Sequence, residues 1–339
     1  MAYSKCFSTI YANQSQTNVT IGLQYQGIPE RVFFSTVTTV PCFVFLFING
    51  TMLFSLRSKP VFRETSRYIL LYNLLFADTL NLALSQLLYL IAACRIRLTY
   101  PVCGILVMLS NVTTEISPLT LVVMSLERYV AVCYPLRHAT IITIKNTGVA
   151  IIVVWAFSSL SVLTRVLLLL NFPFAELENL QMKDFCGKES MLLDPMSDIY
   201  DRAYTYFLFV LGGVTVTCSY IGVMVAARSA STDKASAKKA RNTLLLHLVQ
   251  LGLSLSSTIQ NPFLIAISKV LDRIIIVRIQ IILYVCIIIF PRCLSALIYG
   301  IRDQTIRPVL MYHLCCQWKR SPFFSHSSTK AKISILITS

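Results

Sequence analysis

Charged side chains are scarce in this chain. Only 13% of its 339 residues are Asp, Glu, Lys or Arg, while 55% are hydrophobic and the mean hydropathy is +0.68. A soluble domain carries about 25% charged residues, with which it covers its surface. The composition therefore argues against an ordinary soluble protein and indicates that a lipid bilayer surrounds most of the chain.

The residue patterns that carry enzyme or metal chemistry are also missing. The four histidines are scattered through the sequence, and no set of residues has the spacing of metal ligands. The sequence contains no glycine-rich loop that would cradle a phosphate and no nucleophile placed beside a general base. It therefore predicts a protein that is not an enzyme and that needs no metal and no cofactor.

Long apolar segments are abundant instead. A helix that spans a membrane needs about 20 mostly apolar residues. Seven apolar segments of this length predict an all-α fold, a seven-transmembrane helix bundle over 32–300. We expect a single bundle because the sequence has no internal repeat, second domain or long linker. An extracellular glycosylated head, 1–31, would precede it, and a cytoplasmic tail with a short interfacial helix, 301–339, would follow. The predicted spans are 32–56, 67–93, 102–133, 146–170, 200–228, 241–268 and 273–300.

Basic residues outnumber acidic ones by 30 to 15, and the excess lies on one side of the predicted bundle. With the amino terminus outside, the cytoplasmic segments hold 18 Lys and Arg against four Asp and Glu, and the outer segments hold ten against nine. Cytoplasmic loops of membrane proteins show this positive excess. We therefore expect a multi-pass plasma-membrane protein with an extracellular N-terminus, in contact with membrane lipids and not with nucleic acid.

Glu127, Arg128 and Tyr129 form a charged triplet at the end of the third predicted span, and Pro135 opens the basic loop that follows. The triplet resembles the Asp/Glu-Arg-Tyr signature of rhodopsin-like G-protein-coupled receptors, and its continuation YVAVCYPLRH resembles the form favoured by odorant receptors. The stretches RYILLYNLLFADTL and PRCLSALIYGIRDQTIRPVL extend the resemblance, to fish-type odorant receptors, over about residues 30–316.

This resemblance implies a receptor that binds a small-molecule odorant between its helices and activates a heterotrimeric G protein. Two alternatives stay open: another rhodopsin-like receptor, for a non-odorant small molecule or peptide, and a transporter or channel. An amine receptor would normally place an Asp in the outer third span, where this chain has Ser110. A transporter would favour internal repeats and broken helices, and the sequence shows neither.

The resemblance also implies a switch at the cytoplasmic ends of the helices. Glu127 and Arg128 would hold these ends closed until an agonist releases the arginine for the G protein. Tyr220 and Tyr299 match the family tyrosines that meet the released arginine.

Asp78, Asn81 and Ser85 follow an i, i+3, i+7 spacing, so they form one polar stripe that should face the bundle. In the resembled family this aspartate often binds sodium together with a third-span serine, a role that suits Ser117. The seventh span departs from the family's Asn-Pro-x-x-Tyr and supplies Arg292. We expect Arg292 to replace sodium in a buried ion pair with Asp78; the alternative is that its side chain reaches elsewhere.

Glu115 and Arg165 are the other two charged residues that we expect inside the membrane. Glu115 lies 13 residues before Arg128, which places it about 140° away around the helix, toward neighbouring spans. We expect a structural ion pair between Glu115 and Arg165 rather than a ligand contact. The acidic residues at the outer loop 171–199 are interpreted as a solvated face; they are Glu176, Glu178, Asp184, Glu189, Asp194, Asp198 and Asp201.

Cys103 lies 25 residues before Arg128, a helical length close to the membrane thickness, so the two residues should lie at opposite membrane surfaces. Cys186 is the only cysteine of the long outer loop. A Cys103–Cys186 disulfide would fix that loop over the bundle, and the oxidising exterior permits it. Cys94 and Cys6 remain rival partners.

Further expectations concern the ligand site and covalent modification. The Asn-x-Ser/Thr triplets at Asn13 and Asn18 are candidate glycosylation sites. Beyond the last span, apolar residues on one face predict a helix in the membrane interface, followed by a cysteine pair that could carry palmitate, Cys315 and Cys316. By position in the outer half of the bundle, the predicted ligand contacts are Ser110, Asn111, Thr114, Tyr204, Thr258 and Val285.

Overall fold

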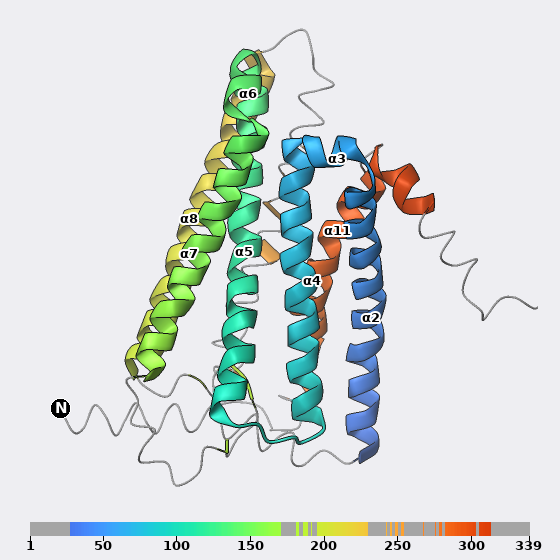
Figure 1. Cartoon of the computed structure of the whole chain (residues 1–339), viewed down its shortest axis with the longest axis vertical. Coiled ribbons are helices and arrows are strands. Elements are labelled where there is room, and N and C mark those ends of the chain that lie inside the picture. The colour runs from blue at the N-terminus through green and yellow to red at the C-terminus, as the bar shows by residue number, and fades with distance from the viewer. Residues whose placement is uncertain are drawn as a thin grey trace, which may run out of the picture.

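Long parallel and antiparallel helices make up the computed structural model of the chain (Figure 1). It describes residues 28–170, 181–182, 186–188, 191, 195–229, 282–302 and 305–312, and a few positions between 242 and 279. The long helices are α2 (Ile28–Ser58), α4 (Ser66–Ala93), α5 (Tyr100–Cys133), α7 (Ile144–Leu170) and α8 (Pro195–Ser229). The shorter ones are α3 (Pro60–Glu64), α6 (Pro135–Ile141), the π-helix η3 (Tyr284–Ile289) and α11 (Phe290–Arg302), which continues η3.

The five long helices are each long and apolar enough to cross a membrane. Each contains one of the first five predicted spans, and their ends differ from the predicted ones by at most five residues. The second half of the seventh predicted span is η3 and α11, whereas the sixth span, 241–268, lies almost wholly outside the described residues. The prediction of an all-α helix bundle is confirmed.

Helix α5 is the centre of the described bundle, since it packs against α4, α7 and α8 (Figure 1). Two hydrogen bonds between polar side chains connect three of these helices. Nε1 of Trp155 on α7 donates a hydrogen bond of 2.9 Å to Oδ1 of Asn73 on α4, and Nδ2 of Asn73 donates one of 2.9 Å to Oγ1 of Thr120 on α5. In lipid such polar groups must find partners inside the protein, so these hydrogen bonds fix how the three helices face one another.

One end of the bundle, called here the disulfide end, carries the loop between α7 and α8. Cys103, in the first turn of α5, forms a disulfide with Cys186, and Cys94 is a free thiol. The backbone nitrogen of Met182 donates a hydrogen bond of 3.0 Å to the carbonyl of Leu98. These links fix the described parts of the loop against the start of α5, while Cys6 lies outside the described residues.

The opposite end, called here the Arg128 end, holds the largest apolar cluster and the predicted interfacial helix. Residues 306–312 are helical. Ile306 and Leu310 are buried in this cluster together with Met52 and Tyr299, so part of the helix's apolar face packs on the bundle itself. The packing is close at Gly300, where a Cβ would collide with the end of the Leu310 side chain and force it to shift. The two predicted palmitoylation sites, Cys315 and Cys316, lie outside the described residues.

Candidate functional site

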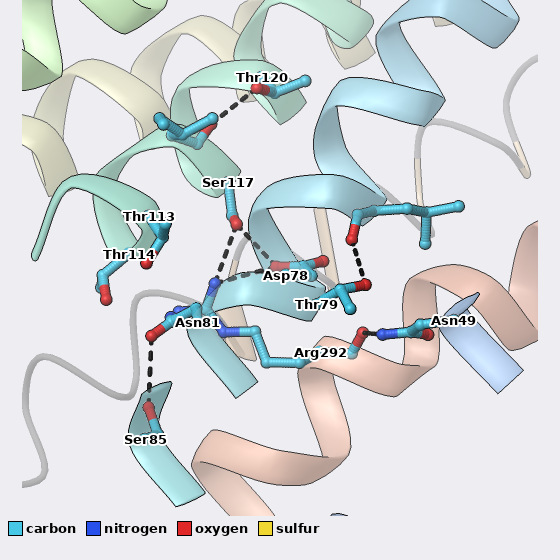
Figure 2. Close-up of polar contacts among 12 residues, drawn as sticks. Asn49, Asp78, Thr79, Asn81, Ser85, Thr113, Thr114, Ser117, Thr120 and Arg292 are labelled. Carbon is cyan, nitrogen blue, oxygen red and sulfur yellow. Dashed lines mark hydrogen bonds and ion pairs between the residues drawn. The ribbon is translucent and has the colours of Figure 1, made fainter. Parts of the chain in front are cut away.

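A buried ion pair joins α11 to α4 in the middle of the bundle. Nη1 of Arg292 lies 2.9 Å from Oδ1 of Asp78 and donates a second hydrogen bond of 2.9 Å to Oγ of Ser117 on α5. The Ser117 hydroxyl in turn donates to the same Asp78 oxygen at 2.6 Å. Figure 2 shows the Arg292 side chain extending from its helix to the other two residues. Three helices thus meet at one closed triangle of charge-assisted hydrogen bonds.

Because the triangle is buried, each of its two charges depends on the other for its stabilisation. Asp78 is 2% exposed and Arg292 5% exposed, so water can solvate neither charge alone. Removal of one member of a buried pair leaves the other as an uncompensated charge, which typically costs about 3–5 kcal/mol. Nδ2 of Asn49 on α2 also donates to the carbonyl of Arg292 at 3.5 Å, which ties the backbone of α11 to a fourth helix.

Asn81, one turn along α4 from Asp78, connects the triangle to two further residues of α5, Ser110 and Thr114. Its side-chain oxygen must face Arg292, because an amide nitrogen there would set donor against donor. In this orientation the oxygen accepts a hydrogen bond from Nη2 of Arg292 at 2.8 Å, and the amide nitrogen donates to Oγ of Ser85 at 3.3 Å. The same oxygen lies 3.1 Å from Oγ1 of Thr114, whose hydroxyl can donate either to it or to the carbonyl of Ser110, at 2.8 Å. The Ser110 hydroxyl lies 3.4 Å from the same carboxamide. Two of the predicted ligand residues therefore touch the group that holds Arg292.

A second buried cluster surrounds Glu115, on the face of α5 that looks toward α7 and α8. Its Oε1 accepts hydrogen bonds from Nη1 of Arg165 and, at 3.2 Å, from Oγ of Ser161, both on α7. Its Oε2 accepts one of 3.0 Å from the Tyr204 hydroxyl on α8. The Arg165 guanidinium also lies over the Tyr204 ring, 5.1 Å from its centroid. Glu115 and Arg165 are thus partners within the protein, as the sequence analysis expected.

Asp201 is the member of this cluster that sequence reasoning missed. It was interpreted as part of a solvated acidic face, but it is 8% exposed and its Oδ1 lies 3.2 Å from Nη2 of Arg165. The predicted span 200–228 already placed Asp201 in a helix, so the difference lies in the direction that its side chain faces. It faces Arg165 on α7 and not the solvent. Asp198, in contrast, is half-buried and pairs with Arg202, at 2.7 Å, on its own helix.

The charged triplet lies at the Arg128 end of α5. Nε of Arg128 lies 3.0 Å from Oε2 of Glu127, and Nε2 of His138, on α6, lies 3.9 Å from Oε1 of the same carboxylate. Tyr220 is half-buried on α8, and Tyr299 is buried on α11 among the residues of the largest apolar cluster. The structure places these residues near one end of the bundle, and their role as a switch stays a prediction.

The remaining predicted ligand residues are not gathered at one point. Asn111 is half-buried on α5, and Tyr204 lies on the far side of that helix from Asn81, bound to Glu115. Val285 packs against Cys42 and neighbouring apolar side chains of α2 and α4. Thr258 and the predicted glycosylation sites, Asn13 and Asn18, lie outside the described residues. Among the described residues, no group of three His, Cys, Asp or Glu side chains could hold a metal ion.

Comparison with known proteins agrees with this architecture. Residues 48–312 match the family described as "7 transmembrane receptor (rhodopsin family)". The chain is similar to Odorant receptor 131-2 of Danio rerio, with 32% identity over 283 residues that cover 80% of this chain and 83% of that receptor. It is also similar to two proteins of Rattus norvegicus: Olfactory receptor 1078, with 25% identity over 81% of this chain and 82% of that receptor, and Olfactory receptor 1500, with 27% identity over 47% and 50%. The chain therefore belongs to the rhodopsin family of seven-transmembrane receptors, among its odorant receptors.

Proposed function

We propose that this receptor is activated by a small-molecule odorant and passes the signal to a heterotrimeric G protein. The similarity to Odorant receptor 131-2 over 80% of the chain supports the ligand class. The contact of Ser110 and Thr114 with Asn81, and of Asn81 with Arg292, supports the mechanism, because it gives a ligand in the bundle a direct connection to the central ion pair.

The disulfide end is proposed to be extracellular and the Arg128 end cytoplasmic. The Cys103–Cys186 disulfide needs an oxidising compartment, and the excess of Lys and Arg lies in the segments at the other end. In the plasma membrane both conditions are satisfied, and the disulfide end is accessible to an odorant from outside the cell. The head, 1–31, would then carry glycans on Asn13 and Asn18, and the tail, 301–339, would contact lipid through palmitate on Cys315 and Cys316.

The odorant would bind between the helices at the disulfide end. Its contacts on α5 would be Ser110, Asn111 and Thr114. A ligand group that bonds to Thr114 competes with the Asn81 oxygen for that hydroxyl, and so alters the support of Arg292. Tyr204, Thr258 and Val285 would complete the site from the other helices.

The response would reach the G protein through the charged triplet. Glu127 lies 3.0 Å from Nε of Arg128, and this ion pair would hold the receptor inactive. Activation would break this pair, and the released Arg128 would meet Tyr220 and Tyr299 as the ends of α8 and α11 move. The positive Arg128 end would present the basic surface on which the G protein docks.

The decisive experiment is a cyclic AMP assay in cells that express the chain together with an olfactory-type G protein. Amino-acid, bile-acid and small-volatile pools would be tested separately, with Arg128→Ala as the matched control at equal surface expression. A response in one pool that the control lacks supports the proposal. Response to a peptide or another non-odorant ligand would favour the alternative receptor class, and a ligand-evoked current without any G protein would contradict the proposal in favour of a channel.

A further inference from the structure

Four side chains of alternating charge, called here the charge series, extend from the loop between α7 and α8 into the interior of the bundle. Nζ of Lys188 lies 2.8 Å from Oδ2 of Asp201, and Oδ1 of Asp201 lies 3.2 Å from Nη2 of Arg165. Arg165 in turn binds Glu115. The Lys188 side chain is 40% exposed, whereas the Arg165 and Glu115 side chains are each 7% exposed. The charge series therefore connects a surface loop with a buried carboxylate through three ion pairs.

Asp201 is the residue on which the charge series depends. Each of its two carboxylate oxygens takes a different cation, Arg165 on α7 and Lys188 on the loop. The four residues together carry two positive and two negative charges. Without the Asp201 charge, two cations would be left with the single carboxylate of Glu115, and the loop would lose its ion pair with α8.

The place of Lys188 in the loop gives this ion pair a geometric role. Lys188 follows Cys186 by two residues, and the disulfide fixes Cys186 to the start of α5. The ion pair with Asp201 fixes the same short segment to α8. One covalent and one ionic attachment, on two different helices, thus hold residues 186–188 at the disulfide end.

We propose that Asp201 is a positioning residue of the ligand site. Through Lys188 it holds the 186–188 segment over the disulfide end, and through Arg165 it orients Glu115, which receives the hydrogen bond of the Tyr204 hydroxyl. The inference rests on the proposed ligand site for its functional meaning. Its structural part needs no ligand, since an ordered loop segment is measurable in the free receptor.

Hydrogen–deuterium exchange of the purified, ligand-free receptor tests the structural part. We expect Asp201→Asn to speed exchange of the amides in residues 181–191 roughly fivefold, because local opening of the loop no longer breaks an ion pair. Asp198→Asn is the matched control, since it removes the same charge from the same helix but affects only the exposed pair with Arg202. Asp201→Glu should restore slow exchange. Equal exchange in the Asp201→Asn and Asp198→Asn receptors would overturn the proposal.

Lys188→Gln separates the loop attachment from the folding of the bundle, because it leaves Arg165 between its two carboxylates. It should speed loop exchange as much as Asp201→Asn does, and the double variant should show no further increase, since both changes remove one contact. Faster exchange throughout α5, α7 and α8, with no change confined to the loop, would contradict a positioning role.

The functional part is tested with the amino-acid, bile-acid and volatile pools. At equal surface expression, Asp201→Asn and Lys188→Gln should raise the half-maximal concentration of the active pool up to about fivefold relative to Asp198→Asn, with a smaller effect on the maximal response. Unchanged half-maximal concentrations would refute the link to ligand binding. If no pool activates even the wild-type receptor, the proposed function fails, while the exchange measurement still decides whether Asp201 positions the loop.

Discussion

Arg292 and Asp78 are separated by 214 positions in the sequence and lie 2.9 Å apart in the bundle. The pair occupies the place where the sequence resemblance implies a sodium ion, and a side chain of the receptor supplies the positive charge instead. A fixed guanidinium differs from an exchangeable ion, because it also forms directed hydrogen bonds to Ser117 and Asn81. Asp78 is therefore neutralised by the fold itself, and its environment changes only when α4, α5 and α11 move relative to one another.

The first prediction concerns the strength of this pair. Arg292→Met should lower the stability of the receptor by about 3–5 kcal/mol, because Asp78 is left as a buried charge. Adding Asp78→Asn should recover much of that loss. Thermal unfolding of the purified receptor measures both effects, with Arg307→Met, at an exposed arginine of the short helix, as the control. If Arg292→Met left folding and signalling intact while Asp78→Asn abolished both, the pairing would have no energetic importance.

The second prediction is that loss of the guanidinium creates a response to sodium. In the Arg292→Met receptor, Asp78 and the Ser117 hydroxyl remain as oxygen ligands, so sodium should raise the melting temperature more than potassium does. The wild-type receptor should show no difference between the two salts at equal ionic strength. Asp78→Asn in the variant background should remove the sodium effect, and a sodium effect of equal size in the wild-type receptor would contradict the interpretation.

The third prediction concerns transmission from the ligand residues. Asn81→Leu removes the group that connects Ser110 and Thr114 with Arg292. The maximal cyclic AMP response should fall by more than half, since loss of a hydrogen bond to a charged group costs about 1.5–3 kcal/mol. Ser85→Ala is the control, because Ser85 contacts the same carboxamide but, among the contacts found, not Arg292. Equal responses in the two variants would argue against Asn81 as the connection.

The fourth prediction concerns basal activity. Glu127→Gln removes the carboxylate that holds Arg128 at 3.0 Å, and the side chain of Arg128 is 18% exposed. A partly exposed ion pair contributes about 1 kcal/mol, so basal cyclic AMP should rise roughly fivefold at constant surface expression. His138→Gln, which affects a longer contact of 3.9 Å, should cause a smaller rise. A fall in basal signal with Glu127→Gln would show that the pair supports the active state.

The fifth prediction tests the packing of the short helix 306–312. Gly300→Ala should destabilise the receptor by about 1–3 kcal/mol, because its Cβ would meet the Leu310 side chain. Leu310→Ala alone leaves a cavity and is also destabilising. The double variant should be more stable than the sum of the two changes predicts, since each relieves the defect of the other. Strictly additive melting temperatures would mean that the helix does not pack at this position.

The sequence by itself determined the class of fold and much of the family assignment. Span length and composition are local properties, since about 20 apolar residues suffice to cross the bilayer whatever their neighbours are. The first five spans were therefore placed to within five residues. The four intramembrane charges, Asp78, Glu115, Arg165 and Arg292, were also visible in the sequence, because lipid tolerates charge only where it is paired.

The tertiary structure alone decided how these charged groups are joined to others. The contact of Asn81 with Thr114 and Arg292 depends on the rotation of three helices about their axes, which no local pattern specifies. The burial of Asp201 depends on which face of α8 lies against Arg165 of α7. Hydrophobicity sets which segments enter the membrane, but partner choice inside the bundle follows from close packing and from hydrogen bonds between helices, which depend on how the side chains of neighbouring helices fit together.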